Sequence, residues 1–410
     1  MPIATAAAIR SALSALALGS AALLGCAGAR AQEATGDGVY KDHVDWGVLM
    51  DLSGPASSSQ SVWTAGFQDH VRMVNQSGGV NGRKIDVLIR DNRFSAAADV
   101  LAFDQLTTQT PVIAISGMGA SASQVALAQT IRSGKVPIVG TYTSTVALSE
   151  PVSPMVYNGF CGYKQMAEAG VGSSVDRLGL KAPKVMTVAI DTAGGRDYAK
   201  FVAESAARYG GSASVVTMKV SAVDVTPQVG EIVAQKPDLI TIYGVENTAI
   251  MTMKALAEKR LDIPAFGITY LGTPAVYKAI GPEAGANYTF ISCFTPGGPD
   301  PSPGASALSA FAQGVGHGAL VGNVNYVAGW VAGEIAAEAL ARAGPAPSRQ
   351  KLVDALAPGF AVDTQGLSAP IVYTPNDHTG PQVLKMFGYD YGSGKFRSFG
   401  DYADYAKYAR

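Results

Sequence analysis

The sequence has 410 residues, of which 48% are hydrophobic and 15% charged, and its 31 basic and 32 acidic side chains leave a formal net charge of −1. A near-neutral chain without a basic surplus is not expected to bind nucleic acid. This length exceeds what a single hydrophobic core usually supports, and no low-complexity tract interrupts it, so we expect a compact soluble protein of two lobes.

The first 31 residues have the features of a secretory signal peptide. Arg10 precedes an apolar run, 11–24, that is too short to span a membrane, and the segment ends in the small-x-small cleavage pattern Ala-Arg-Ala. We therefore expect cleavage after Ala31 and a periplasmic protein. The alternative is a lipoprotein, because the Leu-Leu-Gly-Cys stretch that ends at Cys26 resembles a lipoprotein box and would make this cysteine the anchor.

Beyond this leader, short β-branched runs alternate with stretches at helical spacing, and Gly, Pro, Ser or Asp stand at the junctions. The expected strands are 45–50, 84–90, 111–115, 136–139, 184–190, 213–218, 239–243, 265–268 and 288–292. The expected helices are 61–76, 96–107, 122–133, 198–209, 248–259, 326–342 and 349–356. Alternation of this kind predicts βαβ units with parallel sheets, whose ligands bind beyond the carboxyl ends of the strands.

Three connecting regions, 156–163, 291–296 and 366–375, lack helix signals between successive parts of this pattern. A chain that crosses three times between two lobes forms a hinge. We therefore expect the ligand to bind in the cleft between the lobes.

Several segments, in order along the chain, carry a family resemblance. They are VNQSGGVNGRKI at 74–85, LSGP at 52–55 with Gly66 beyond it, RDN at 90–92, VPIV at 136–139, DTA at 191–193 and YTPNDH at 373–378. Together they resemble the periplasmic solute-binding proteins of ABC importers, the branched-chain amino acid type, whose signature N-x-x-G-G-[IV]-x-G-R-x-[IV] is similar to the first segment.

The resemblance implies a type I periplasmic binding fold, an α/β protein in which two Rossmann-like lobes are joined by three hinge crossovers. The first lobe should comprise 44–160 plus 294–364, and the second 161–293 plus 365–410. The resemblance also implies a monomer that is not an enzyme, needs no metal or cofactor, and delivers a small-molecule ligand to the permease and ATPase subunits of an importer.

Two cysteines remain beyond the leader, Cys161 and Cys293. An oxidising compartment is compatible with a disulfide between them, but the residues alone leave two separate buried thiols open. In the family, the first two crossovers, which contain these cysteines, run side by side. The resemblance therefore implies a disulfide that braces the hinge.

In the first lobe, the resemblance places the carboxylate of the ligand against Ser121, Tyr142 and Ser144. These residues follow expected strands, where hydroxyl groups and the unpaired N–H groups of a helix N-terminus favour an anion. The alternative for the two serines is that each only caps a helix.

Elsewhere the chain departs from the family pattern. Tyr270 stands where leucine-type binders usually have a Glu against the ammonium group, while Gly195 and Ser59 each replace an aromatic residue. Glu246 is a candidate for a relocated carboxylate, with a favourable charge at a helix start as the alternative. Trp63 is a candidate for added aromatic surface, so a bulkier or aromatic ligand becomes a rival to leucine.

The expected function is capture of a small carboxylate-bearing solute, a branched-chain or other hydrophobic amino acid, for an ABC importer. Two alternatives stay open: a binder of aromatic acids or amide- or urea-type solutes in the same transporter family, and an exported sensing module for a receptor or sensor kinase. A dehydrogenase is not expected, because Ala122 replaces the third glycine of a dinucleotide fingerprint, and the four scattered histidines lack the spacing of a zinc site.

Overall fold

The computed structural model describes residues 36–297 and 302–409. The expected signal peptide, 1–31, and the lipoprotein candidate Cys26 lie outside these residues. In the described part of the chain, no helix combines the length and the apolarity needed to cross a membrane.

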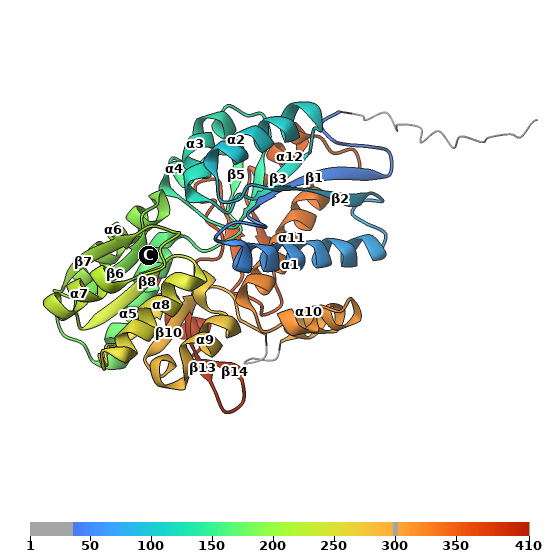
Figure 1. Ribbon diagram of the computed structural model, residues 1–410. Coiled ribbons are helices and arrows are strands. Elements are labelled where there is room, and N and C mark those ends of the chain that lie inside the picture. Colours follow the sequence, from blue (N-terminus) through green and yellow to red (C-terminus); the bar gives the residue numbers. More distant parts are fainter. Residues whose placement is uncertain (1–35, 298–301, 410) are drawn as a thin grey trace, which may run out of the picture. The chain divides into compact units, whose positions relative to one another are not determined.

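The first lobe is built around a parallel five-stranded sheet (Figure 1). Across the sheet, the strands are β2 (Lys84–Asp91), β1 (His43–Met50), β3 (Ala114–Gly117), β4 (Ile138–Thr141) and β5 (Val156–Tyr157). Side chains alternate along β1, so Val48 packs into the core beneath α1 (Ser57–Gln76) and α11 (Val324–Arg342). Its neighbour Leu49 packs into the core beneath α2 (Ala96–Asp104) and α3 (Ser121–Arg132). The sheet is therefore covered on both faces, as expected for parallel strands.

Helices α1 and α11 cross closely because glycines face the partner backbone. A Cβ atom at Gly66 of α1 would lie 2.1 Å from the carbonyl oxygen of Tyr326, and one at Gly329 of α11 would lie 1.9 Å from the carbonyl oxygen of Trp63. Neither position has room for a side chain, so these two glycines set the distance between the helices.

The second lobe is built around a seven-stranded sheet. Across the sheet, the strands are β14 (Lys395–Ser398), β13 (Lys385–Asp390), β10 (Tyr288–Ser292), β9 (Ala265–Gly267), β8 (Leu239–Tyr243), β6 (Lys184–Ile190) and β7 (Ser212–Met218). Strands β6 to β10 are parallel to one another, and β13 and β14 add an antiparallel edge.

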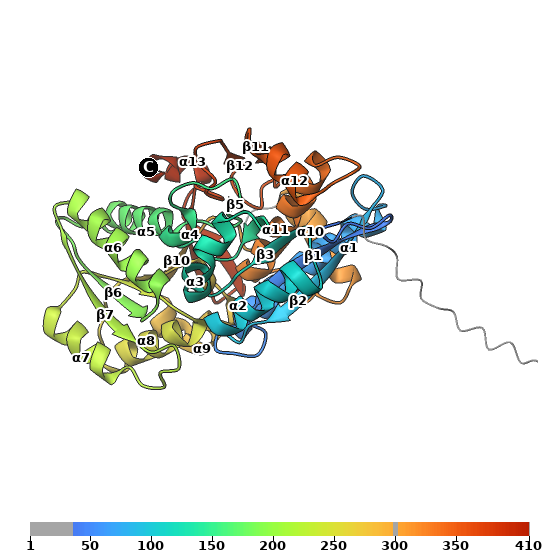
Figure 2. The same cartoon turned by 90° about the horizontal axis from the view of Figure 1, so that it is seen from above.

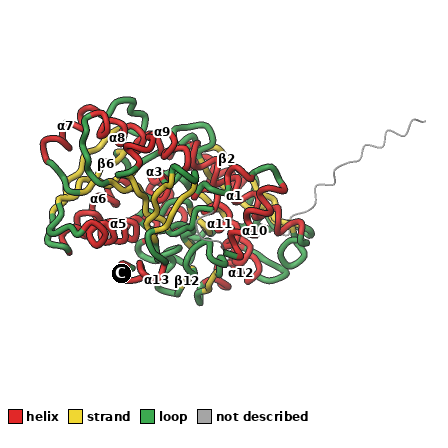
Figure 3. The backbone as a smooth tube through the Cα atoms, turned by 90° about the horizontal axis from the view of Figure 1, so that it is seen from below, coloured by secondary structure: helices red, strands yellow, loops and turns green. Residues whose placement is uncertain are grey.

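Helices cover both faces of this second sheet (Figures 2 and 3). One face carries α5 (Tyr163–Leu178) and α6 (Ala193–Arg208), which pack against each other. The other face carries α7 (Thr226–Gln235), α8 (Glu246–Glu258) and α9 (Pro274–Gly285). The remaining elements are α4 (Val146–Ser149), α10 (Pro303–Gly314), α12 (Arg349–Leu356), α13 (Tyr402–Tyr405) and the short turns η1 (Gln105–Gln109), η2 (Thr269–Leu271), η3 (Gly318–Leu320) and η4 (Ala406–Tyr408).

The α/β fold with two parallel-sheet lobes that the sequence predicts is confirmed, and every expected strand overlaps a strand of the structure. Six helices were not expected from the sequence: the short α4 and α13, and the longer α5, α7, α9 and α10. The longer ones contain residues that disfavour a helix; α5, for example, includes Gly170 and Gly172, and α9 includes Gly281 and Pro282. Tertiary packing outweighs local preference in α5, where Phe266 occupies the space beside Gly170.

The region expected to form the third crossover contains a strand that packs on the first lobe. Strand β12 (Ile371–Tyr373) pairs with β11 (Phe360–Val362) within the expected crossover, 366–375. The Tyr157 ring of β5 contacts this hairpin, with ring centroids 5.6 Å from Phe360 and 5.7 Å from Tyr373. The hairpin thus packs on the first lobe, and the chain reaches the second sheet only at β13. We propose that the third crossover is 374–384, and the limits of the two lobes otherwise remain as proposed from the sequence.

Replacing Gly329 by Ala should destabilise the first lobe, because the added methyl group would overlap the backbone of α1 at Trp63. We expect the free energy of unfolding, measured by urea denaturation, to fall by about 1–3 kcal/mol. Gly230→Ala in α7 is the matched control, since no atom lies within 4 Å of its added carbon, and it should raise stability by roughly 0.5–1 kcal/mol. A Gly329→Ala protein as stable as the wild type would contradict this account of the helix crossing.

Candidate ligand-binding site

A small cavity, with about 40 Å³ open to the centre of a water-sized sphere, lies between the carboxyl ends of strands from both sheets. Its walls are mostly aromatic rings, hydroxyl groups and glycine backbone. They are formed by Ala56, Ser59, Gln60, Phe94, Gly119, Ser121, Tyr142 and Thr143 of the first lobe and by Tyr163, Ile190, Tyr243, Gly244, Val245 and Tyr270 of the second. This is where parallel α/β sheets place their ligands, because the loops after the strands meet there.

The N-terminus of α3 forms one wall of the cavity. Ser121 is the first residue of this helix, and within the described chain its hydroxyl has no hydrogen-bond partner. The Gln60 side chain holds the loop before α3 in place, since its Oε1 accepts from the Asp51 N–H at 2.7 Å and its Nε2 donates to the Gly119 carbonyl at 2.9 Å. A hydroxyl and the free N–H groups of a first helical turn form a preformed site for an anion.

Tyrosine hydroxyls join the two lobes around the cavity. Tyr163 of α5 is hydrogen-bonded to Thr143 of the first lobe and accepts a hydrogen bond from Tyr243, at 2.9 Å between the two phenol oxygens. On the opposite side, the Tyr270 hydroxyl donates to the Tyr142 carbonyl oxygen at 3.0 Å. These bonds span the cleft, so the structure is that of a closed cleft.

These phenols are uncharged at neutral pH. Burial is the largest cause that raises the pKa of Tyr163, Tyr243 and Tyr270 above its usual value near 10. The close approach of two of the rings depends on Gly194 in α6, because a Cβ atom there would lie 2.1 Å from the Tyr243 hydroxyl and 2.7 Å from that of Tyr163. The cavity therefore offers neutral hydroxyl groups that can both donate and accept.

Among the described residues, none of those that line the cavity carries a charge. Two acidic groups in the loops and helices around the cavity are already bound within the protein. Glu246, the first residue of α8, accepts from the Thr273 hydroxyl at 2.6 Å, and Asp197 of α6 accepts from the Val146 N–H of the first lobe at 3.2 Å. The site therefore lacks a carboxylate that faces the ligand and could pair with an ammonium group.

Four of the residues singled out in the sequence line the cavity: Ser59, Ser121, Tyr142 and Tyr270. Tyr142 and Tyr270 lie against each other with ring centroids 4.7 Å apart. Ser59 donates its own hydroxyl proton to the Ala56 carbonyl at 3.0 Å, which leaves its lone pairs as acceptors. A binding role for these residues stays a prediction.

Four other candidates do not line this cavity. Ser144 turns away and is hydrogen-bonded to the Ser149 hydroxyl at 2.9 Å, and Gly195 packs in the first turn of α6 with its N–H bonded to Thr192. Glu246 faces Thr273, as described above. Trp63 lies fully buried behind the wall, with its ring 6.0 Å from that of Tyr142, so its contact with the cavity runs through this tyrosine.

Sequence reasoning missed several of the lining residues, among them Gln60, Thr143, Tyr163 and Tyr243. Thr143 lies between two residues that were singled out, and Tyr243 is the last residue of an expected strand, so the rule that ligands bind at carboxyl ends could have found both. Tyr163 had no such signal, because the helix that begins there was not expected.

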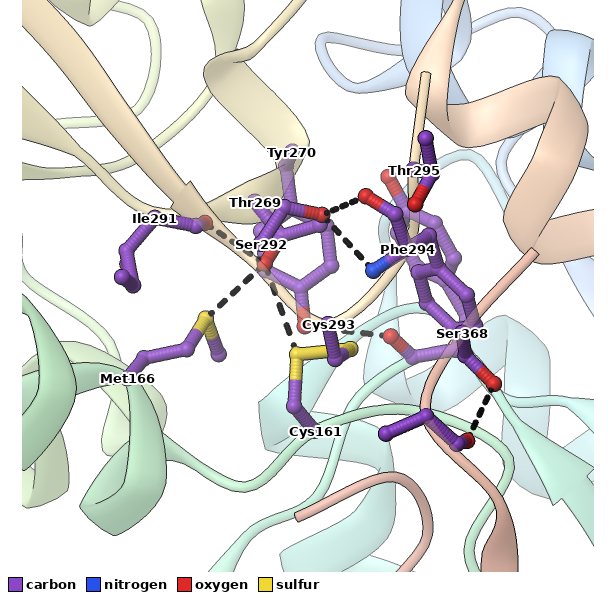
Figure 4. Close-up of a disulfide and its surroundings, with 12 residues drawn as sticks. Cys161, Met166, Thr269, Tyr270, Ile291, Ser292, Cys293, Phe294, Thr295 and Ser368 are labelled. Carbon is purple, nitrogen blue, oxygen red and sulfur yellow. Dashed lines mark hydrogen bonds between the residues drawn. A yellow bond between two sulfur atoms is a disulfide. The ribbon is translucent and has the colours of Figure 1, made fainter. Parts of the chain in front are cut away.

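The hinge beneath the cavity is tied together by a disulfide (Figure 4). Cys161 of the first crossover and Cys293 of the second are bonded, with their Cα atoms 6.0 Å apart. Phe294, next in the chain, forms a β-bridge with Ser368, and the Asn158 N–H donates to the carbonyl oxygen of His378 at 3.0 Å. The first two crossovers are thus joined covalently, and hydrogen bonds link both to the segment that leads into the third.

The sequence matches the family model described as periplasmic binding protein over residues 44–395. The chain belongs to this family. It is therefore a solute-binding protein and not an enzyme, in agreement with a cavity that holds hydroxyl groups and a helix N-terminus.

Solved structures share the fold at low sequence identity. A fatty acid ABC transporter substrate-binding protein from Thermomonospora curvata is 20% identical with a TM-score of 0.80, and the match covers 91% of this chain and 96% of that one. A branched chain amino acid ABC transporter protein from Thermus thermophilus with bound valine is 19% identical with a TM-score of 0.76, and covers 88% and 95%. A solute-binding protein from R. palustris in complex with benzoate is 21% identical with a TM-score of 0.75, and covers 87% and 96%.

Identities at this level show a common fold and leave the ligand of this chain open. No curated protein matches the sequence significantly.

Removing the disulfide should lower stability, because the bond closes a segment with a sequence separation of 132 residues. We expect the double variant Cys161→Ser, Cys293→Ser to lose about 2–5 kcal/mol of unfolding free energy in urea. A reductant should destabilise the wild type and leave the double variant unchanged. Wild-type protein that unfolds at the same urea concentration with and without reductant would show that the bond contributes nothing.

Proposed function

We propose that this protein is the extracytoplasmic solute-binding component of an ABC importer, and that its ligand is a small monocarboxylate with an aromatic or branched apolar body and no ammonium group. The observation that carries the proposal is the lining of the cavity: an anion site at the N-terminus of α3, aromatic walls, and no acidic side chain among the described lining residues. The family and the expected signal peptide both support a location in the periplasm.

The carboxylate would lie against the first turn of α3. There the Ser121 hydroxyl and the unpaired N–H groups can donate to it, and the helix dipole adds a partial positive charge. Hydrogen bonds to a charged group are roughly twice as strong as neutral ones, so this end of the site would supply much of the affinity.

The body of the ligand would lie among the aromatic rings. Tyr142, Tyr270 and Phe94 border the cavity from the first and second lobes, and their flat faces suit an aromatic or branched hydrocarbon group. In this closed form the cavity is small: about 40 Å³ is open to the centre of a water-sized sphere, well below the usual range of roughly 300–1,000 Å³ for small-molecule sites. This size favours a compact ligand over a long acyl chain.

The branched-chain amino acid expected from the sequence is less well supported than the aromatic-acid alternative. An ammonium group buried in this cavity would need a carboxylate partner, and an unpaired buried charge is costly. The candidate for that partner, Glu246, faces Thr273 instead. Proteins with bound valine and with bound benzoate share this fold, so the fold itself is compatible with either class.

Closure of the lobes would trap the ligand. Only the closed cleft allows Tyr270 to reach the Tyr142 carbonyl, Tyr163 to reach Thr143 and the lobes to contact the solute together. A ligand that touches both lobes therefore stabilises the closed state relative to the open one. The closed protein would then be recognised by the permease.

A matched ligand series tests the proposal by isolating the ammonium group. We expect 4-methylpentanoate to bind at least ~10-fold more tightly than leucine, and 3-phenylpropanoate more tightly than phenylalanine, because each pair differs mainly by an ammonium group that would be buried without a partner. Calorimetry measures the affinities, and thermal shift gives a first screen, since a bound ligand raises the melting temperature. Tighter binding of the amino acid in both pairs would overturn the ligand class and favour the amino acid expected from the sequence.

Ser121→Ala should weaken binding of the best monocarboxylate by about 1.5–3 kcal/mol, the usual contribution of a hydrogen bond to a charged group. Ser144→Ala is the matched control, because this hydroxyl faces Ser149 and does not line the cavity, and its affinity should equal that of the wild type. Calorimetry on folded protein compares the two. If both variants bind the ligand with equal affinity, the carboxylate does not bind at the N-terminus of α3.

A further inference from the structure

A second cluster of ligand-type side chains lies at the opposite end of the first sheet, where β1 and β2 begin. His43 and Asp45 are on β1, and Asp86 is the residue that pairs with Asp45 on the neighbouring strand β2. One nitrogen or oxygen atom from each of the three side chains lies within 4.8 Å of the others. In the described part of the chain, no other group of three histidine, cysteine or acidic side chains comes together in this way.

The histidine is oriented with a nitrogen toward both carboxylates. Its Nδ1 lies 2.7 Å from Oδ1 of Asp42, and an ionised carboxylate only accepts, so Nδ1 carries the proton. Its Nε2 lies 3.9 Å from Oδ1 of Asp45 and 3.9 Å from Oδ2 of Asp86. These distances are too long for direct hydrogen bonds, and in the neutral ring the Nε2 lone pair faces two negative groups.

A second layer of contacts holds the cluster in this arrangement. The Tyr40 ring stacks on His43 with centroids 4.2 Å apart and an angle of 7° between the planes, and its hydroxyl acts to lower the pKa of Asp45, which burial raises. Together with Asp42 on Nδ1, these contacts reproduce the way in which metal-binding histidines and carboxylates are oriented by outer partners. Lys84, opposite His43 on β2, forms no ion pair with the cluster within the described residues.

We propose that His43, Asp45 and Asp86 bind a divalent metal ion, with Zn²⁺ as the best match to one imidazole and two carboxylates. Ligand atoms at about 2.1 Å from a tetrahedral Zn²⁺ lie about 3.4 Å from one another. The two separations from Nε2 are 3.9 Å, and all three ligand atoms lie within 4.8 Å of one another, so binding requires them to approach by about 0.5–1.4 Å through side-chain rotation. The ion would offset the repulsion between the facing carboxylates.

The three side chains differ in how exposed they are to solvent, and this indicates a site that is open to water on one side. Asp86 is 56% exposed, whereas Asp45 is 14% and His43 is 22% exposed, so water would complete the coordination sphere on the side of Asp86. An ion held there joins the beginnings of two neighbouring strands, far along the sheet from the ligand cavity at their carboxyl ends. Its effect would therefore be on the stability of the first lobe and independent of solute binding.

Titration of the mature protein, without an affinity tag and freed of metal with a chelator, tests the site. We expect one equivalent of Zn²⁺ to bind in calorimetry and to raise the melting temperature, while Ca²⁺ and Mg²⁺ at the same concentration do neither. Co²⁺ should produce visible absorption bands that Zn²⁺ removes. His43→Gln and Asp86→Asn should each weaken Zn²⁺ binding at least tenfold, as expected for loss of one of three ligands.

Asp104→Asn is the control, since this exposed aspartate of α2 lies outside the cluster, and it should bind Zn²⁺ like the wild type. Asp86 is exposed, so its variant should stay folded and give an interpretable titration. Absence of stoichiometric Zn²⁺ binding by the wild type, or equal affinities of the wild type and Asp86→Asn, would overturn the proposal. Either result would leave the proposed solute-binding function untouched.

Discussion

Hydroxyl groups buried between the lobes need hydrogen-bond partners, and the structure provides them from the opposite lobe. Tyr270 reaches the Tyr142 carbonyl, and Tyr163 reaches Thr143 while it accepts from Tyr243. A buried hydroxyl without a partner costs roughly 1–3 kcal/mol. The lobes can therefore separate only if water replaces these partners, and the closed cleft is held by polar contacts as well as by apolar burial.

The same constraint explains how the cavity stays both polar and uncharged. The phenols satisfy one another, so no ionised group is needed to pair with them. Two acidic residues near the cavity have partners of their own: Glu246 has Thr273, and Asp197 has a backbone N–H across the cleft. Under the proposed function, the specificity of the site for its solute would depend on the shape of the cavity and on the helix N-terminus at Ser121.

The fold could be predicted from the sequence because its signals are local. The β-branched runs and the helical spacing mark nearly all of the parallel strands, and the carboxyl ends of those strands mark the cavity. The errors have non-local causes. Helix α5 is stabilised by contacts such as Phe266 against Gly170, and the hairpin of β11 and β12 joins the first lobe through Tyr157, contacts that no stretch of sequence shows.

The sequence also predicts some of the residues that line the cavity, again because the signal is local. Tyr142 directly follows a strand, and Ser121 and Tyr270 come a few residues after one, where position along the chain largely determines position in space. Ser144 and Glu246 also follow strands, but each side chain is held by a partner, Ser149 or Thr273, and turns from the cavity. Which hydroxyl or carboxylate finds such a partner depends on the packed structure, so the sequence predicts which loops border the cavity but not which of their side chains line it.

The bond between Cys161 and Cys293 closes the segment 161–293, which includes strands β6 to β10, into a covalent ring. The chain enters and leaves this ring at neighbouring points, which is the geometry of one domain inserted into another. A proteolytic cut at any peptide bond inside the ring would leave the two fragments attached to each other. The second lobe could thus survive a nick in an exposed loop that would split an unbridged chain into separate pieces.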